Sequence, residues 1–100
     1  MAWSERQVGD VVLTEARGRI DLSNADAFRD QLTAAMTKAK TGVVVDLSGV
    51  DYISSAGIGV FIETYKRLHA SGHSFKLVHL LPRVRNIFTY AGLDRILTIE

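Results

Sequence analysis

Residues 43–61 read VVVDLSGVDYISSAGIGVF, and they predict a strand, a short polar turn and a helix in succession. The run Val43–Val45 is continuously apolar and stops at Asp46, which is typical of a strand buried on both faces of a parallel sheet. Apolar residues at helical spacing follow: Ile58, Phe61, Ile62 and Tyr65. The helix is therefore expected to begin near Ser54–Ser55. A strand that enters a helix through such a turn points backbone N–H groups, and one or two hydroxyls, at solvent.

The length and composition predict one small domain over residues 1–100. A chain with 47% apolar and 23% charged residues can bury a core of its own. The net charge of +1 argues against nucleic acid or an anionic membrane as the main partner. The absence of cysteine excludes disulfides and cysteine-based metal sites. The first ten residues, MAWSERQVGD, lack the apolar segment of a signal peptide, and no apolar run reaches the roughly 18–20 residues of a spanning helix. We therefore expect a cytoplasmic protein without membrane insertion.

The amino-terminal part of the chain predicts a hairpin and a helix. The turn signal Gly9–Asp10 separates two strand patterns, Trp3–Val8 and Val11–Ala16, and Gly18 is expected to end the second strand. A helix is expected from about Asn24 to Lys38, with Ser23 as its N-cap. Its inner face comprises Ala25, Phe28, Leu32, Ala35 and Met36.

The carboxy-terminal part alternates helix and strand. The helix from Ser55 to Ala70 is followed by a strand at Phe75–Leu80, and a further helix begins near Pro82 and ends before Gly92. A short strand closes the chain. The whole order is β-β-α-β-α-β-α-β, which predicts an α/β fold with a mixed, mostly parallel sheet packed with helices.

Three groups of residues together resemble a known family. They are Gly18-Arg19-Ile20-Asp21; Val45-Asp46-Leu47-Ser48 leading to Ser54-Ser55-Ala56-Gly57-Ile58-Gly59; and Pro82-Arg83-Val84-Arg85 with Ala91-Gly92-Leu93. In this order and spacing the chain resembles the STAS domain, and within it the bacterial anti-sigma factor antagonists. The resemblance covers almost the whole chain. It implies a protein-binding switch rather than an enzyme, with no cofactor and no metal of its own.

The resemblance also implies a phosphorylation site. The family's helix-start motif usually reads Asp-Ser-(Ser/Thr)-Gly-Leu-Gly, and its first serine is phosphorylated by the partner kinase. Aligned on Gly57-Ile58-Gly59, that serine is Ser55, with Ser54 as second choice. Ser54 stands where the family usually has aspartate, and Ala56 stands at the second Ser/Thr position. The family's acidic residues near the phosphosite match Asp21 and Asp46.

The partners that the resemblance implies are an anti-sigma factor that is a serine kinase, and a PP2C-type phosphatase. Binding of the anti-sigma factor would release a sigma factor, and phosphorylation of Ser55 would end that binding. The exposed side of the second helix is expected to join the partner surface. The expected contact residues are Asp21, Ser23, Asn24, Asp46, Ser54, Ser55, Ala56, Gly57, Ile58 and Gly59.

Other interpretations of the same residues stay open. Serines before a helix are common caps, so a capping role alone competes with a regulatory one, although Ser54 can cap while Ser55 is modified. A STAS subunit of another assembly, such as a lipid-transport complex or a signalling scaffold, would need no phosphorylation. An enzyme or small-molecule binder is disfavoured, because Ser55 lacks a Gly-X-Ser-X-Gly elbow and no phosphate-binding glycine loop is present. His69 and His73 lack a third metal ligand.

Overall fold

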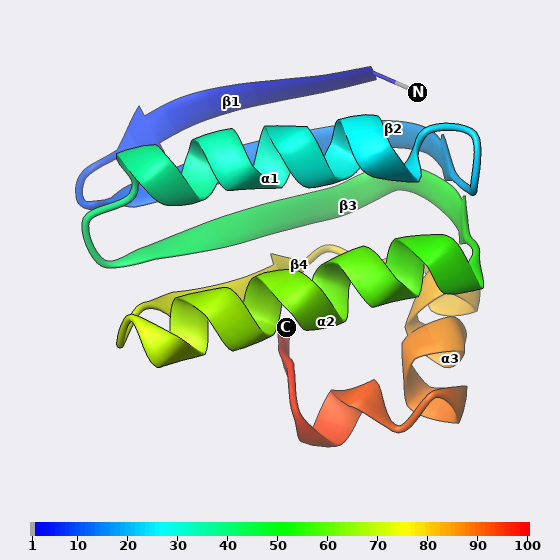
Figure 1. The fold of residues 1–100 in the computed structure, drawn as a ribbon. Coiled ribbons are helices and arrows are strands. Elements are labelled where there is room, and N and C mark those ends of the chain that lie inside the picture. The colour runs from blue at the N-terminus through cyan, green and yellow to red at the C-terminus, as the bar shows by residue number, and fades with distance from the viewer. Residues whose placement is uncertain (1) are drawn as a thin grey trace.

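The computed structural model describes residues 2–100 as a five-stranded sheet with three helices (Figure 1). The elements in order are β1 (Ala2–Val8), β2 (Val11–Ile20), α1 (Ala25–Lys38), β3 (Gly42–Ile53), α2 (Ser55–Ala70), β4 (Ser74–Val78), α3 (Pro82–Tyr90), the 3-10 helix η1 (Leu93–Arg95) and β5 (Thr98–Ile99). This is the α/β order that the sequence predicts.

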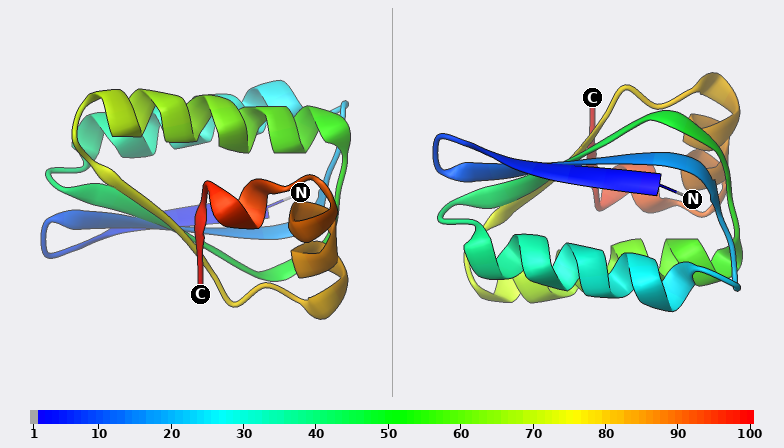
Figure 2. Two further views of the ribbon diagram at one scale, coloured as in Figure 1. Left: turned by 90° about the horizontal axis from the view of Figure 1, so that it is seen from below. Right: turned by 90° about the horizontal axis from the view of Figure 1, so that it is seen from above.

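The strands lie in the order β1-β2-β3-β4-β5, with β1 antiparallel to β2 and the later pairs parallel. Gly9 has a φ of 62°, and this left-handed conformation makes the tight hairpin between β1 and β2. Helices α1 and α2 lie side by side on one face of the sheet (Figure 2). Helix α3 packs beside β3, past the end of the short strand β4 (Figure 1).

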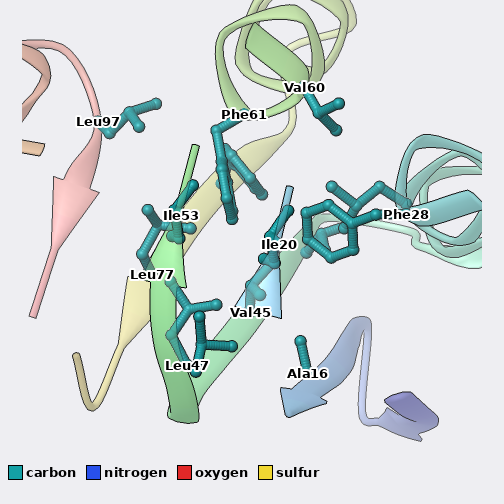
Figure 3. Packing of buried hydrophobic residues seen from close by; sticks show 14 of the residues in the cluster. Ala16, Ile20, Phe28, Val45, Leu47, Ile53, Val60, Phe61, Leu77 and Leu97 are labelled. Carbon is teal, nitrogen blue, oxygen red and sulfur yellow. The ribbon is translucent and has the colours of Figure 1, made fainter. Parts of the chain in front are cut away.

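The core lies between the sheet and helices α1 and α2. Alternate residues of β3, beginning with Val43, Val45 and Leu47, are fully buried, because successive strand side chains point to opposite faces. The ring of Phe61 in α2 lies 5.3 Å from that of Phe28 in α1 and 5.3 Å from that of Phe88 in α3. Figure 3 shows Phe28 and Phe61 directed toward the sheet residues. One aromatic side chain of α2 thus joins all three helices.

Both central strands run farther than the sequence predicts. Strand β3 continues past Leu47 to Ile53, and β2 continues past Gly18 to Ile20. The pairing of β2 with β3 shifts register on either side of Gly18, whose φ is 98°. Both shifts place the extra residue on β3, and Gly18 itself pairs with Val50. The glycine expected to end the strand is therefore a paired residue inside it. The predicted polar turn shrinks to Ser54 alone, so the strand leads almost directly into α2.

Three further predictions concern the ends of helices and strands; two are wrong and one is confirmed. The N-cap position of α1 is Asn24 rather than Ser23, and no side chain caps that helix. Strand β4 ends at Val78 rather than Leu80, because His79 takes a φ of 59° that breaks the extended backbone. Gly92, with a φ of 74°, follows the end of α3 as predicted.

Candidate functional site

The end of β2 and the start of α2 lie together. Ile20 pairs with Ile53 at the carboxyl ends of the two parallel strands, and the N–H of Ser54 donates a 2.8 Å hydrogen bond to the carbonyl of Ile20. The chain leaves this edge in two directions, through Asp21–Asn24, which we call the β2–α1 loop, and through Ser54–Gly59, which we call the α2 start. Parallel strands that end side by side bring these two segments to one surface.

Ser54 is the N-cap of α2, as the sequence allows. Its backbone is extended, its carbonyl accepts the N–H of Ile58 at 2.9 Å, and its hydroxyl oxygen accepts the N–H of Gly57 at 3.4 Å. The last bond is long for an N–H···O contact, so the cap is a weak one. Ser54 is also half-buried, which leaves its hydroxyl committed to the helix.

Ser55 is the first helical residue and is exposed. No acidic residue lies in the first turn of α2. Within residues 2–100 the N–H groups of Ser55 and Ala56 donate to no protein acceptor, as is usual at a helix start. The partial positive charge of the helix dipole is therefore unbalanced beside an accessible hydroxyl. This arrangement tolerates an added anion better than most positions on the surface.

The β2–α1 loop is held by its own polar side chains. The Asp21 carboxylate accepts the N–H of Ser23 at 3.0 Å and its hydroxyl at 2.5 Å. Asn24 accepts the N–H of Asp21 at 3.0 Å and donates to the carbonyl of Arg19 at 2.8 Å. The hydrogen bond from the Ser23 hydroxyl is the main cause that holds the pKa of Asp21 below its ordinary value. The loop therefore has one defined shape and an ionised aspartate.

The two glycines of the α2 start have different surroundings. A Cβ on Gly57 would lie 2.7 Å from Cγ2 of Ile20 and 2.8 Å from Cγ2 of Ile53, both in the core. Gly57 is buried, and its missing side chain lets α2 rest on the strand ends. A Cβ on Gly59 would have no atom within 4 Å, and Gly59 is exposed. The fold requires the first glycine but not the second.

The structure does not bring Asp46 to this site, so the expectation that it lies near Ser55 is wrong. Ile53 lies seven positions after Asp46 in β3 (53 − 46 = 7), roughly 20 Å along the strand. Asp46 alternates with the buried Val45 and Leu47, so it faces away from α1 and α2. Partial burial raises the pKa of Asp46, but hydrogen bonds from Ser48 and His79 outweigh it and leave the pKa below its ordinary value.

The other predicted site residues lie either in the β2–α1 loop or in the α2 start. Asp21, Ser23 and Asn24 form the braced loop, while Ala56 and Ile58 are half-buried in the α2 start. Leu22, at the centre of that loop, is 83% exposed and was not predicted as a site residue. The only sequence signal at Leu22 is that an apolar residue stands among residues that commonly cap helices.

Features of other functions are not found in the described part of the chain. Residues 2–100 contain no group of three metal-ligating side chains. No helix there is both long and apolar enough to cross a membrane. His69 stacks on Tyr65 in the last turns of α2, and the helix ends before His73.

Comparison with known proteins shows the family and the fold of this chain. The family model described as "Mlab, STAS domain" matches residues 3–98. The putative anti-sigma factor antagonist BtrV of Bordetella bronchiseptica is 31% identical over 86 residues, which are 86% of this chain and 74% of BtrV. The anti-sigma-B factor antagonist of Bacillus subtilis is 33% identical over 83% of this chain and 75% of its own. The crystal structure of a putative anti-sigma factor antagonist from Thermotoga maritima is 28% identical, with a TM-score of 0.89, over 97% of this chain and 84% of that one.

A sheet in this strand order, with a capped helix start beside a braced loop at its carboxyl edge, defines a STAS-type regulatory fold. The family model covers nearly the whole chain, and two relatives exceed 30% identity over more than four-fifths of it. The chain belongs to the STAS domain family, and these relatives within it are named as anti-sigma factor antagonists.

Proposed function

We propose that this chain is an anti-sigma factor antagonist that binds its target through the β2–α1 loop and the α2 start. The binding would free a sigma factor from the anti-sigma factor. One observation carries the proposal: Ser55 is exposed at the first residue of α2 while Ser54 holds the cap. The names of the curated relatives support the class of partner.

Phosphorylation of Ser55 by the anti-sigma factor, acting as a serine kinase, would switch the antagonist off. A phosphate adds a charge of about −1.5 to −2 and three acceptor oxygens. At the positive end of α2 this charge is favourable to the helix, so the fold is retained. The charge instead opposes whatever docks over the helix start, and the ionised Asp21 of the neighbouring loop adds to that field. A PP2C-type phosphatase would restore the binding form.

The geometry favours Ser55 over Ser54 as the modified residue. The Ser54 hydroxyl accepts a hydrogen bond from Gly57, and Ser54 is half-buried. Transfer of a phosphoryl group to it would require the cap to open. The exposed hydroxyl of Ser55 makes no hydrogen bond within residues 2–100.

Gly59 supports close approach of the partner. An exposed glycine inside a helix lowers stability by about 0.5–1 kcal/mol relative to alanine, and no contact in the fold explains its presence. Ser55 lies one turn earlier on the same side of α2, so the two positions form a strip with little side-chain bulk. A partner backbone or side chain can lie directly on that strip.

A phosphorylation assay tests the switch. The chain is incubated with its anti-sigma factor kinase and ATP, and the phosphate is mapped by mass spectrometry in the wild type, Ser54→Ala and Ser55→Ala. We expect one phosphate in the wild type and in Ser54→Ala, and none in Ser55→Ala. Binding of the anti-sigma factor without any phosphate on Ser54 or Ser55 would overturn the switch.

A binding assay tests the effect of the charge. Ser55→Asp should weaken binding to the anti-sigma factor while the melting temperature stays nearly unchanged. The matched control is Ser71→Asp, which adds the same charge at the exposed C-cap of α2, the opposite end of the helix. It should leave the affinity unchanged. A large fall in the melting temperature of Ser55→Asp would point to a structural role for this residue.

A further inference from the structure

Leu22 is the most exposed aliphatic side chain among the large exposed hydrophobic residues of the described chain. It is 83% exposed, compared with 53% for Val8 and 52% for Ile96. It is not among the partly buried residues that pack against the core. Isolated surface leucines are common, so exposure alone assigns no role. Leu22 is distinguished by the hydrogen bonds that fix its loop and by the position of that loop beside the α2 start.

The loop that carries Leu22 is fixed on both sides of it. Asp21 before it and Ser23 after it are joined by two hydrogen bonds between the Asp21 carboxylate and the N–H and hydroxyl of Ser23. The N–H of Asn24 also donates to the carbonyl of Asp21 at 3.2 Å, which closes the turn. A side chain on such a loop loses little backbone freedom when it binds, because the backbone is already ordered.

The loop also lies against the proposed partner surface. The 2.8 Å bond from Ser54 to Ile20 joins the N-cap of α2 to the last residue of β2, directly before the loop. A partner that covers Ser55 and Gly59 therefore lies next to the loop that carries Leu22.

Two carboxylates close to Leu22 in the sequence have an arginine beside them within the chain. The Asp21 carboxylate is bound by Ser23 and lies 3.8 Å from Arg19, and Asp26 is 2.6 Å from Arg29. Asp21 nevertheless keeps its charge at this surface, because its pair with Arg19 is long and exposed. The apolar side chain of Leu22 is the other feature that a partner can recognise at this point.

We propose that Leu22 is the apolar anchor of the partner surface and inserts into an apolar recess of the anti-sigma factor. The inference rests on the proposed function and names the contact that supplies much of its affinity. Pre-ordered apolar side chains that enter a desolvated recess are typical hot spots of protein interfaces. The loop thus provides binding energy, while Ser55 provides the switch.

The dissociation constant of the anti-sigma factor kinase used in the phosphorylation assay is measured by calorimetry for four chains. They are the wild type, Leu22→Ala, Leu22→Met and Val8→Ala. Val8 is the matched control, because it is exposed at the hairpin, at the opposite end of β2 from the loop. Leu22→Ala should weaken binding by about ten- to a hundredfold, given the burial of a leucine side chain. Leu22→Met and Val8→Ala should stay within about threefold of the wild type, and all four should melt at nearly the same temperature.

Equal affinity of Leu22→Ala and the wild type would overturn the inference and leave the proposed function intact. A similar loss in Val8→Ala would also overturn it, because apolar area anywhere would then suffice. If the wild type itself binds no anti-sigma factor, the proposed function fails and the anchor fails with it.

Discussion

The N–H of Ser54 donates a 2.8 Å hydrogen bond to the carbonyl of Ile20, which ties the first turn of α2 to the last residue of β2. Two segments more than thirty residues apart are thereby held as one surface before any partner arrives. The braced loop on one side and the capped helix on the other need no further ordering. Binding to a surface of this kind avoids most of the conformational entropy loss that a flexible loop would suffer.

The two glycines of the α2 start should respond to alanine in opposite ways. Gly57→Ala should lower the free energy of unfolding by about 1–3 kcal/mol, since its Cβ would overlap two core isoleucines that cannot withdraw. Gly59→Ala should raise it by about 0.5–1 kcal/mol, because it replaces an exposed helical glycine with open space around it. Urea unfolding of the two variants measures both effects.

The Gly59→Ala variant also separates the effect of a glycine on stability from its effect on partner binding. Gly59→Ala should weaken binding of the anti-sigma factor although it stabilises the chain. Unchanged affinity of the stabilised variant would show that the partner does not approach Gly59.

The cap at Ser54 should have a small but measurable effect on stability. Ser54→Ala should lower the free energy of unfolding by about 0.5–1 kcal/mol, at the lower end for caps, because the bond to Gly57 is 3.4 Å long. Ser54→Asp should match or exceed the wild type, since a carboxylate caps as well and also interacts with the helix dipole. Thermal unfolding at low and at high salt separates the capping hydrogen bond from the interaction with the helix dipole, because salt screens the interaction with the dipole. A loss of several kcal/mol in Ser54→Ala would mean that the serine does more than cap.

Thr14 should be replaceable with a gain in stability. Its side chain is fully buried in β2, and its hydroxyl is without a hydrogen-bond partner within residues 2–100. Thr14→Val keeps the shape and removes the unpaired polar group, so the free energy of unfolding should rise by about 1 kcal/mol or more. Thr64→Val is the control, because the buried Thr64 hydroxyl donates to the carbonyl of Val60 at 2.8 Å. It should give no gain, and equal gains in both variants would contradict the explanation.

Much of the fold could be predicted because its signals are local. The apolar run at Val43, the helical spacing after Ser55 and the glycine after α3 each reflect contacts within a few residues. Strand length was harder, because it depends on what pairs from elsewhere. Gly18 resembles a strand end in isolation, but it pairs with Val50 of β3 and the strand continues past it to Ile20.

The candidate site was predicted in part for the same reason. Ser54 and Ser55 are defined by the local helix start, and the structure places them as cap and first helical residue. The position of Asp46 depends on how far β3 continues after it, which the sequence underestimated by six residues (53 − 47 = 6). Leu22 carries no pattern of its own, and its exposure follows only from hydrogen bonds made by its neighbours.

Asp46 should make the stability of the chain sensitive to acid. Its folded-state pKa lies below the ordinary value of 3.8, since hydrogen bonds from Ser48 and His79 outweigh partial burial. The carboxylate therefore contributes stability that is fully present above pH 3.8 and is lost as the pH falls through the lowered folded-state pKa. Asp46→Asn should lower the free energy of unfolding by about 1 kcal/mol at neutral pH, and the gap to the wild type should close in acid. Asp21 shifts in the same direction, so the single variant should retain some acid sensitivity that Asp21→Asn combined with Asp46→Asn reduces further. Urea unfolding at several values from pH 5 down to the acid limit measures these differences, and a gap that widens over that range would contradict the assigned direction.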